Sequence, residues 1–248
     1  MISLFFGLLA FVLAIGTINW TIWLIRRIRS IFYKNFRHSY KASTSVIIPV
    51  YKESPEVLKE TINSILKNEP NEIIIVLDHT EKENARMIEE KYGNIKKIKS
   101  IIINKPGKRP ALVAGIQKAQ SEIVILVDSD TRWASKDFLV NLLKPFADPK
   151  VGGVGTRQKV YKPKNWTHRL IDWMLDIKYS DFITSDSLSG SVLCLSGRTA
   201  AYRRKIILPM LEDLEYEYFL GYKGMGGDDA RLTNLVLKKG YNTVYQDT

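Results

Sequence analysis

Residues 124–130, with the sequence VILVDSD, join a run of aliphatic side chains directly to two aspartates that are one residue apart. Aliphatic and β-branched residues in such a run are typical of a buried strand. A carboxylate that loses its water is costly to bury unless it is paired or binds a metal. We therefore predict that Asp128 and Asp130 lie at the open end of a strand and meet a cation there.

A short apolar run followed by an amphipathic segment precedes this stretch three times. Strands are predicted at SVIIPV (45–50), EIIIVLD (72–78), KSIIIN (99–104) and EIVILVD (122–128), with helices at 54–68, 81–93 and 109–120. This alternation predicts an α/β domain with a parallel sheet that helices cover on both faces. Such sheets bind ligands at the carboxyl ends of their strands, so polar residues that follow strands should converge on one edge. These residues are Tyr51, Glu53, Asp78, Asp128 and Asp130.

The alternation of short apolar runs with amphipathic segments is less regular after Trp133. Helices are predicted at 136–148, 165–185, 209–220 and 228–240, and strands at 151–161, 191–204 and 241–247.

Residues 1–25 contain no charged side chain, and about 20 apolar residues suffice to cross a bilayer as a helix. We predict a transmembrane helix rather than a cleaved signal peptide, because no basic stretch precedes the apolar run and no small-residue cleavage site follows it. Six Lys or Arg and no acid follow within residues 26–41. By the positive-inside rule the amino terminus then points outward. The expected location is the cell membrane, with a single span in this chain and a cytoplasmic soluble domain.

The basic juxtamembrane segment 26–42 supplies six of the eleven net positive charges. Apolar side chains are interleaved with these charges, namely Ile31, Phe32, Tyr33, Phe36 and Tyr40. This mixture predicts an interfacial helix on an anionic membrane surface. The rest of the chain is only mildly basic and holds no nucleic-acid motif, so nucleic acid is not an expected partner. Cys194 is the only cysteine, which excludes a disulfide framework.

An Asp-x-Asp pair at a strand end, beside further acids and a Lys-Arg pair, is what a nucleoside-diphosphate site with a divalent cation requires. Oxygen ligands suit Mg²⁺ or Mn²⁺, and Mg²⁺ usually completes its shell with phosphate oxygens and water. The cation would neutralise charge on a leaving diphosphate. Asp78, at the end of its own strand, either caps the next helix or hydrogen-bonds the base or ribose of a nucleotide.

Two further charged pairs stand at predicted helix starts. Lys108 and Arg109 either contact a phosphate or nucleotide, which the helix dipole would also favour, or form a solvated basic turn. Asp228 and Asp229 follow the glycine-rich sequence GMGG (224–227). They either cap their helix or form a carboxylate pair in which one member has a raised pKa and acts as a general base.

Five motifs occur in the order VIIPVYKE (46–53), the strand-end Asp78, GKR (107–109), DSD (128–130) and GGDDARLTN (226–234). Together they resemble the family 2 inverting glycosyltransferases, and among them the membrane synthases of the hyaluronan, chitin and cellulose type. VLCLSGRTAAYRR (192–204) is similar to the segment before their acceptor channel. The resemblance implies a Rossmann-like GT-A domain over residues 43–248 that uses a UDP-sugar donor.

The resemblance also implies roles for the site residues. Tyr51, Glu53 and Asp78 would hold uridine, and Lys108 and Arg109 would contact the uracil or phosphate side of the donor. Asp128 would contact the nucleotide and the metal, and Asp130 would bind Mg²⁺ or Mn²⁺. Asp229, with Asp228 beside it, would take the proton of the acceptor hydroxyl. The implied reaction is a single displacement that inverts the anomeric carbon while UDP leaves.

The sequence departs from the family pattern in two places. After the paired acids, Ala230 stands where the family has Arg, and Arg231 follows. The Gln-x-x-Arg-Trp motif that closes the acceptor site in those synthases does not occur before Thr248. We therefore expect the transferase domain to be incomplete, with a carboxyl-terminal segment or a partner supplying the motif. Cys194 either lines the acceptor entrance, as the resemblance implies, or is a buried core cysteine.

The main hypothesis is a membrane-anchored enzyme that transfers a sugar from UDP-N-acetylglucosamine or a UDP-uronic acid to a growing glycan or a lipid-linked acceptor. A second hypothesis is a non-catalytic or partner-dependent subunit that binds a nucleotide sugar. A third, a nucleotidyltransferase, would need a glycine-rich triphosphate loop after the first strand. The sequence there, PVYKESPE (49–56), contains no glycine.

Overall fold

A computed structural model describes residues 2–219, 221–224 and 227–248 of the chain. These residues form two compact units. One comprises Met1–Lys34 and Gln158–Ser189, and the other comprises Asn35–Arg157 and Gly190–Thr248. All the side chains that the sequence predicts for the functional site belong to the second unit.

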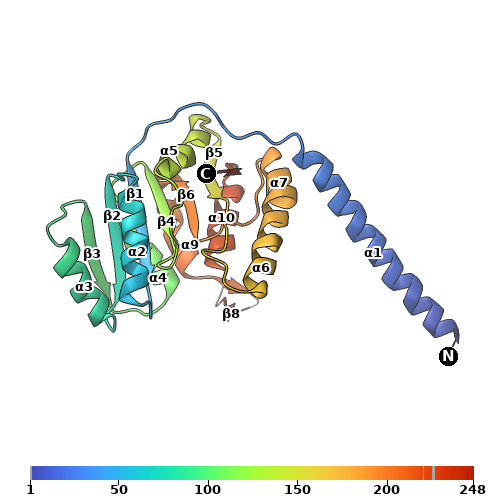
Figure 1. Cartoon of the computed structure of the whole chain (residues 1–248), viewed down its shortest axis with the longest axis horizontal. Coiled ribbons are helices and arrows are strands. Elements are labelled where there is room, and N and C mark those ends of the chain that lie inside the picture. Colours follow the sequence, from blue (N-terminus) through green and yellow to red (C-terminus); the bar gives the residue numbers. More distant parts are fainter. Residues whose placement is uncertain (1, 220, 225–226) are drawn as a thin grey trace. The chain divides into compact units, whose positions relative to one another are not determined.

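The second unit is built on a mixed sheet whose described strands follow the order β3-β2-β1-β4-β6-β5-β9 (Figure 1). The strands are β1 Thr44–Val50, β2 Glu72–Asp78, β3 Ile98–Ile103, β4 Ile123–Val127, β5 Val151–Thr156, β6 Thr199–Arg203 and β9 Asn242–Gln246. Neighbouring strands are parallel except at β6, which is antiparallel to β4 and β5. Because β1 lies between β2 and β4, the winding of the chain reverses beside β1, where open α/β sheets bind ligands.

Helices connect these strands largely as the sequence predicts. The helices of this unit are α2 Pro55–Leu66, α3 Lys82–Tyr92, α4 Lys108–Lys118, α5 Phe138–Leu143, η1 Lys144–Ala147, α8 Arg204–Ile207, η3 Leu208–Met210, α9 Leu211–Glu215 and α10 Asp228–Lys238. A short hairpin of β7 (Tyr218–Phe219) and β8 (Tyr222–Lys223) precedes α10. Helix α2 has the predicted cap, because Ser54 Oγ accepts a hydrogen bond from the Val57 N–H at 3.3 Å.

The central strands are buried on both faces, as expected for strands that are covered by helices. Every residue of β2 and β4 is buried. Val46 and Ile48 of β1 belong to the core cluster that also contains side chains of α2 and α3. The alternate residue Ile47 faces α4 at Gly115, where an added Cβ would lie 2.4 Å from the Ile47 Cγ2. Gly115 therefore allows α4 to pack closely on the sheet.

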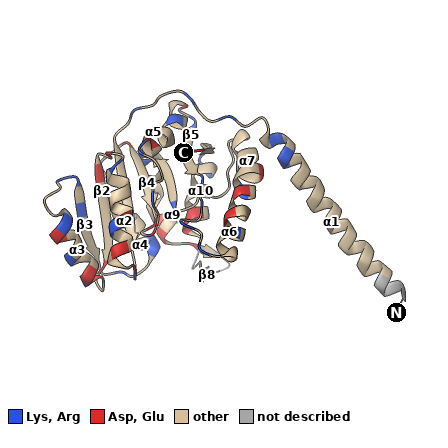
Figure 2. Ribbon diagram, in the orientation of Figure 1, with Lys and Arg blue, Asp and Glu red and all other residues tan. Residues whose placement is uncertain are grey.

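The first unit combines the amino-terminal helix with a segment far along the chain. It contains α1 (Ile2–Ser30), α6 (Trp166–Ile177), the π-helix η2 (Lys178–Ile183) and α7 (Thr184–Leu188). Among the described residues one helix, Phe6–Ser30, is long and apolar enough to cross a membrane. Figure 2 shows that α1 carries basic residues only at its carboxyl-terminal end. One amino-terminal apolar helix thus fits a membrane anchor, and the division at residues 25 and 42 stays a prediction.

The interfacial helix predicted over residues 26–41 ends at Ser30. The chain that follows is not helical. Two of its aromatic side chains, which belong to the second unit, pack against the core of that unit instead of facing outward. Phe36 and Tyr40 are partly buried against the core, and the Phe36 N–H donates to Gln246 Oε1 at 2.9 Å. The Tyr40 hydroxyl donates to the Glu122 carboxylate.

Three other predicted elements are shorter than expected, the last of them being the strand predicted at 151–161, which ends at Thr156. Of the strand predicted at 191–204, only Thr199–Arg203 forms, because the backbone before it bonds to side chains and loops: the Leu195 N–H donates to Thr233 Oγ1 at 3.0 Å. The helix predicted at 209–220 is limited to 3-10 and α-helical turns ending at Glu215, and Leu220 lies outside the described residues. Cys194 in the first of these segments is exposed, so the buried-core interpretation was wrong.

Candidate functional site

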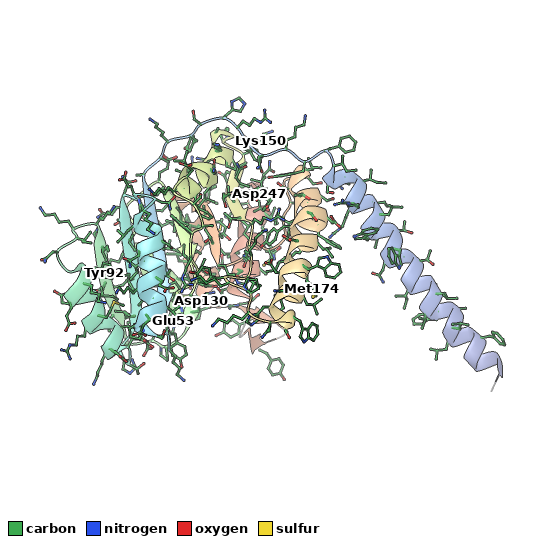
Figure 3. All side chains as sticks on the ribbon, in the orientation of Figure 1. Glu53, Tyr92, Asp130, Lys150, Met174 and Asp247 are labelled. Carbon is green, nitrogen blue, oxygen red and sulfur yellow. The ribbon has the colours of Figure 1, made fainter. Side chains whose placement is uncertain are left out.

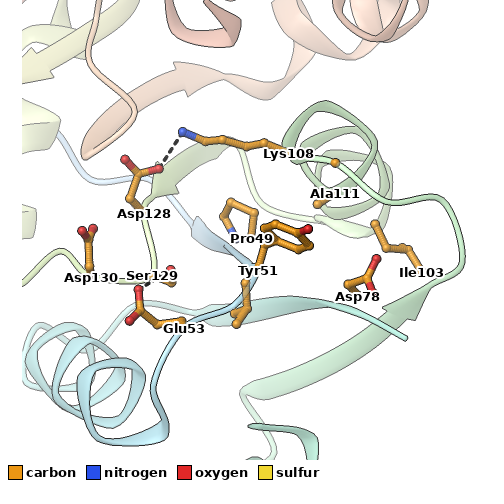
Figure 4. A pocket seen from close by; sticks show the side chains of 12 residues that line it. Pro49, Tyr51, Glu53, Asp78, Ile103, Lys108, Ala111, Asp128, Ser129 and Asp130 are labelled. Atoms are coloured by element: carbon orange, nitrogen blue, oxygen red, sulfur yellow. Dashed lines mark hydrogen bonds and ion pairs between the residues drawn. The ribbon is translucent and has the colours of Figure 1, made fainter. Parts of the chain in front are cut away.

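A pocket of about 310 Å³ lies at the carboxyl ends of β1, β2, β3 and β4 (Figure 4). Figure 3 shows Glu53 and Asp130 at this end of the sheet and Lys150, which precedes β5, at the other. The pocket is lined by Pro49, Val50, Tyr51, Glu53, Asp78, Ile103, Gly107, Lys108, Ala111, Asp128, Ser129 and Asp130. The polar residues that were predicted to follow the strands thus lie together in this pocket. The volume of the pocket is in the usual range for a small-molecule site.

The loop after β4 carries Asp128 and Asp130, and both residues line the pocket. Asp128 Oδ1 forms an ion pair with Lys108 Nζ at 2.7 Å. Asp130 is exposed and forms no ion pair with any residue that the structure describes. In Figure 4 both carboxylates face the side of the loop on which Lys108 lies. One of the two acids is therefore already neutralised by a side chain, and the other is open to a ligand.

The loop after β1 supplies a second edge of the pocket. Ser129 Oγ donates to Glu53 Oε2 at 3.1 Å, which joins the ends of β1 and β4 (Figure 4). Tyr51 is 57% exposed and offers its ring to the pocket opening. Between them Lys52 has a φ of 53°, a left-handed conformation that is uncommon for a side-chain-bearing residue. This turn places the neighbouring Tyr51 and Glu53 side chains in the pocket wall.

Asp78 at the end of β2 is only 6% exposed. Its Oδ1 accepts hydrogen bonds from the Thr80 N–H at 3.0 Å and the Thr80 hydroxyl at 2.8 Å. These two bonds lower the pKa of Asp78 below its ordinary value, so the carboxylate is charged. Its Oδ2 is buried and has no hydrogen-bond partner among the described residues. The side chain does not cap α3, whose N-cap is Glu81, and one oxygen of this pocket-lining residue is left without a partner among the described residues.

Lys108 at the start of α4 also reaches the two acids at the start of α10. Its Nζ lies 3.3 Å from Asp228 Oδ2 and 3.9 Å from Asp229 Oδ1. Burial opposes the charge on Lys108, but the carboxylates around it outweigh that effect and raise its pKa above the ordinary value. One ammonium group thus connects Asp128 at the pocket with the acid pair at α10.

The acid pair does not cap α10. Gly227, in a left-handed conformation with a φ of 74°, is the N-cap residue, and no side chain of the described residues forms a capping hydrogen bond. Met225 and Gly226, which precede Gly227 in the sequence, lie outside the described residues. Burial and the neighbouring Asp228 raise the pKa of Asp229 to about 6, although the Gly197 N–H and Lys108 act in the opposite direction. A carboxylate with such a pKa is suited to general-base chemistry near neutral pH.

Gly197, in the loop before β6, forms backbone hydrogen bonds with both Asp229 and Asp128. Its N–H donates to Asp229 Oδ2 at 2.7 Å, and its carbonyl oxygen accepts the Asp128 N–H at 3.1 Å. A Cβ at this position would lie 2.4 Å from Asp229 Oδ1 and 3.0 Å from Lys108 Nζ. Only glycine therefore leaves room for the acids and the ammonium group to meet.

Arg109 does not join this group. Its Nη2 pairs with Glu217 Oε2 at 2.6 Å, its Nη1 donates to the Gly224 carbonyl at 3.4 Å, and it is not among the residues that line the pocket. Arg231 Nη1 lies 3.7 Å from Glu217 Oε1. The two arginines thus support the hairpin before α10, and a nucleotide contact for Arg109 stays a prediction.

The residues present fit a divalent cation that arrives with a ligand. In the described part of the chain no group of three or more His, Cys, Asp or Glu could hold a metal alone. Mg²⁺ often uses only one or two carboxylates and fills its shell with phosphate oxygens and water. Asp128 would supply one of these carboxylates, and Asp130, which is exposed and has no ion-pair partner among the described residues, would supply the other.

The site contains two residues whose roles the sequence did not indicate. Gly197 lies in the motif that is similar to the segment before the acceptor channel of those synthases, but its contact with Asp229 joins positions 32 residues apart. Ser129 stands between the predicted aspartates, yet its hydrogen bond to Glu53 depends on how two loops meet. For Gly197 the available signal was a glycine in a segment that otherwise reads as a strand, which often marks close backbone approach.

Residues 42–248 match the family model described as "Glycosyltransferase like family 2". The chain therefore belongs to glycosyltransferase family 2, and its sheet with the strand-end pocket is the GT-A fold.

Among curated proteins, the chain is 33% identical over 245 residues to a hyaluronan synthase of Streptococcus pyogenes, covering 94% of the chain and 58% of that protein. It is 32% identical over 206 residues to an N-acetylglucosaminyltransferase of Azorhizobium caulinodans, covering 81% of the chain and 52% of that protein. The chain thus spans about half the length of the curated relatives it matches. A mannosyltransferase from Pyrobaculum calidifontis, solved with GDP-Man and Mn²⁺, shares the fold with a TM-score of 0.72 at 22% identity, covering 95% of the chain and 65% of that structure.

Proposed function

We propose that this chain is a membrane-anchored, inverting glycosyltransferase that moves a sugar from a UDP-sugar to a growing glycan. The observation that carries the proposal is the cluster at Lys108. One ammonium group lies between Asp128, at the pocket edge, and Asp229, a carboxylate with a pKa of about 6. A donor pocket and a candidate base therefore share one edge of the sheet, which a single-displacement transfer requires.

Each group of the pocket has a part in the proposed reaction. Asp78 Oδ2 accepts a hydrogen bond from the base or ribose, and Tyr51 offers a ring for stacking. Asp130 and Asp128 would hold Mg²⁺ or Mn²⁺, which when bound neutralises charge on the leaving diphosphate. Asp229 removes the proton of the acceptor hydroxyl as its oxygen attacks the anomeric carbon, and UDP leaves from the opposite face. The Gly197 N–H orients the Asp229 carboxylate for this step.

The choice of donor follows from the names of the relatives. An N-acetylglucosaminyltransferase and a hyaluronan synthase support UDP-N-acetylglucosamine or a UDP-uronic acid as the sugar donor. The mannosyltransferase that was solved with Mn²⁺ supports a divalent cation in this fold. The apolar helix followed by basic residues supports a cytoplasmic active site at the cell membrane.

Release of UDP tests the proposal directly. The full chain, in detergent or nanodiscs with Mn²⁺ or Mg²⁺, is offered UDP-N-acetylglucosamine, UDP-glucuronic acid or GDP-mannose with chitin oligosaccharides or polyprenyl phosphate sugars. We expect UDP release from a UDP-sugar only. Binding of UDP without turnover would support the partner-dependent subunit instead, and the absence of both binding and turnover would contradict the proposal.

Asp78→Asn should weaken UDP binding by about 10- to 100-fold, the value of a hydrogen bond to a charged group. The variant keeps an oxygen for Thr80 but replaces the free acceptor with an amide donor. Isothermal titration with UDP measures the change. Asp137→Asn is the matched control, because Asp137 is exposed and outside the pocket lining. Equal affinity of both variants would exclude Asp78 from nucleotide binding.

The pH dependence of kcat/KM for sugar transfer should show the raised pKa of Asp229. Below pH about 6 the carboxyl is protonated and cannot accept a proton, so kcat/KM should rise through pH about 6 and then level off. Asp228→Asn should move this limb to lower pH, because it removes the neighbouring carboxylate that raises the pKa. If the acidic limb of the kcat/KM profile occurred at the same pH in Asp228→Asn as in the wild type, it could not be assigned to Asp229.

Gly197→Ala should reduce transfer by about 100-fold, the scale of an ångström-sized misplacement at a reacting group. The added methyl group would occupy the space of Asp229 Oδ1, so the base moves while the pocket for uridine stays intact. We expect kcat to fall with UDP affinity preserved. Ser196→Ala controls for changes in the loop itself, and a similar loss in that variant would mean that loop folding, not space beside the base, is responsible.

A further inference from the structure

The start of α3 contacts the turn that follows β1. Glu81 is the N-cap residue of α3, but among the described residues its side chain forms no capping hydrogen bond. Its carboxylate is bonded to the neighbouring strand end instead, where Oε1 accepts the Lys52 N–H. The Glu81 side chain therefore binds another part of the chain rather than stabilising the helix that it begins.

Asn84, in the first turn of α3, adds a second contact with the same turn. Its Nδ2 donates to the Glu53 carbonyl oxygen at 2.8 Å and to Glu81 Oε2 at 2.7 Å. Asn84 is 2% exposed, and its Oδ1 is buried without a hydrogen-bond partner among the described residues. An unpaired buried oxygen is unfavourable, but both partners of Nδ2 are acceptors and fix the orientation of the amide. The orientation of Asn84 is thus the one that serves the turn after β1.

The turn that these two side chains hold has an unfavourable backbone conformation. Lys52 has a φ of 53°, in the left-handed region where a residue with a Cβ is disfavoured. On either side of it, Tyr51 and Glu53 line the pocket (Figure 4). The hydrogen bonds from α3 involve the Lys52 N–H and the Glu53 carbonyl oxygen. They therefore hold the left-handed residue from both sides.

We propose that Glu81 and Asn84 are positioning residues for the nucleoside part of the donor. They compensate for the unfavourable backbone of Lys52 and so keep Tyr51 and Glu53 in the pocket wall before the donor binds. Neither Glu81 nor Asn84 is among the residues that line the pocket, so their effect on the donor passes through the turn. This inference rests on the proposed function, in which the pocket takes the nucleoside part of a UDP-sugar.

Titration of the full chain with UDP, combined with substitutions of Lys52, tests the proposal. Glu81→Ala should weaken UDP binding by about 10-fold, the factor that corresponds to the usual cost of a left-handed residue with a Cβ. Adding Lys52→Gly should restore most of the affinity, because glycine adopts a positive φ readily. Adding Lys52→Ala should not restore it, because alanine keeps the Cβ. Both substitutions remove the ammonium group, which lies 5.2 Å from the centroid of the Tyr51 ring, so their difference reports the backbone alone.

Glu83→Ala is the matched control, because Glu83 is an exposed acid in the first turn of the same helix. It should bind UDP as the wild type does. In Glu81→Ala the KM for the donor should rise with the dissociation constant of UDP, while kcat at saturating donor changes by less than about twofold. Thermal unfolding shows whether each variant folds. If Glu81→Ala does not fold, Asn84→Ala is combined with the same two substitutions of Lys52.

Three results would overturn the inference while the wild type still binds UDP. The first is wild-type affinity in both Glu81→Ala and Asn84→Ala. The second is equal affinity when either is combined with Lys52→Gly or with Lys52→Ala, since the turn would then not be the cause. The third is loss of folding in both variants, which would assign the two side chains to domain stability. If the wild type neither bound UDP nor released it from a UDP-sugar, the proposed function would fail and the inference with it.

Discussion

Asp229→Asn is expected to lose sugar transfer by about 10²- to 10⁴-fold, the usual contribution of a general base. The asparagine has nearly the same shape and still accepts the Gly197 N–H, but it cannot take a proton. Binding of UDP should be unchanged, because Asp229 is not among the residues that line the donor pocket. Initial rates of UDP release and titration with UDP measure the two effects separately.

The matched control is Asp228→Asn, the neighbouring acid on the same helix. It also loses a negative charge beside Lys108, since its Oδ2 lies 3.3 Å from the ammonium group. We expect it to retain most of its turnover at pH values above the acidic limb. If the two variants lost activity to the same degree, the charge balance at Lys108 and not proton transfer would explain the loss.

The location of the site follows from the sequence because it depends on strand direction. Strands that alternate with helices are parallel and place their carboxyl ends at one edge, so Asp78 and Asp128 could be brought together without coordinates. The run 123–127 is apolar throughout because β4 is buried on both faces. The first charged residue after such a run is the point where the strand leaves the core.

The contacts that orient the base could not be obtained in this way. The loop before β6 has no hydrophobic period, and its course is set by contacts with residues far along the chain. Gly197 meets Asp229, and Leu195 meets Thr233, through hydrogen bonds across 32 and 38 residues. Composition likewise did not show that the helix ends at Ser30, because aromatic side chains between basic residues suit a membrane surface and a protein core equally well.

Lys108 balances the charges of three neighbouring carboxylates, Asp128, Asp228 and Asp229. Three carboxylates close together would repel one another, and the ammonium group offsets this repulsion. If a nucleoside diphosphate and a divalent cation bind as proposed, Asp128 would be one of the residues that hold the cation, and the Lys108 ammonium group, which now pairs with Asp128 at 2.7 Å, would supply positive charge for a phosphate oxygen.

Asp130→Asn is expected to lower turnover by at least about 100-fold, because a metal ion stabilises several kcal/mol of developing charge. Folding should be unaffected: Asp130 is exposed and forms no ion pair within the described residues, and such surface changes shift stability by about 0.5 kcal/mol or less. Titration of UDP with and without Mn²⁺ provides the sharper measurement. The wild type should bind UDP more tightly with Mn²⁺, and the variant should show much less of this gain.

Asp137→Asn removes a similarly exposed aspartate outside the pocket and should keep both turnover and the Mn²⁺ effect. If Asp130→Asn kept the Mn²⁺ effect as well, the cation would have to be held without this residue. Asp128 alone would be a poor site, because its carboxylate is already paired with Lys108 at 2.7 Å. We therefore expect metal binding at this site to depend on Asp130.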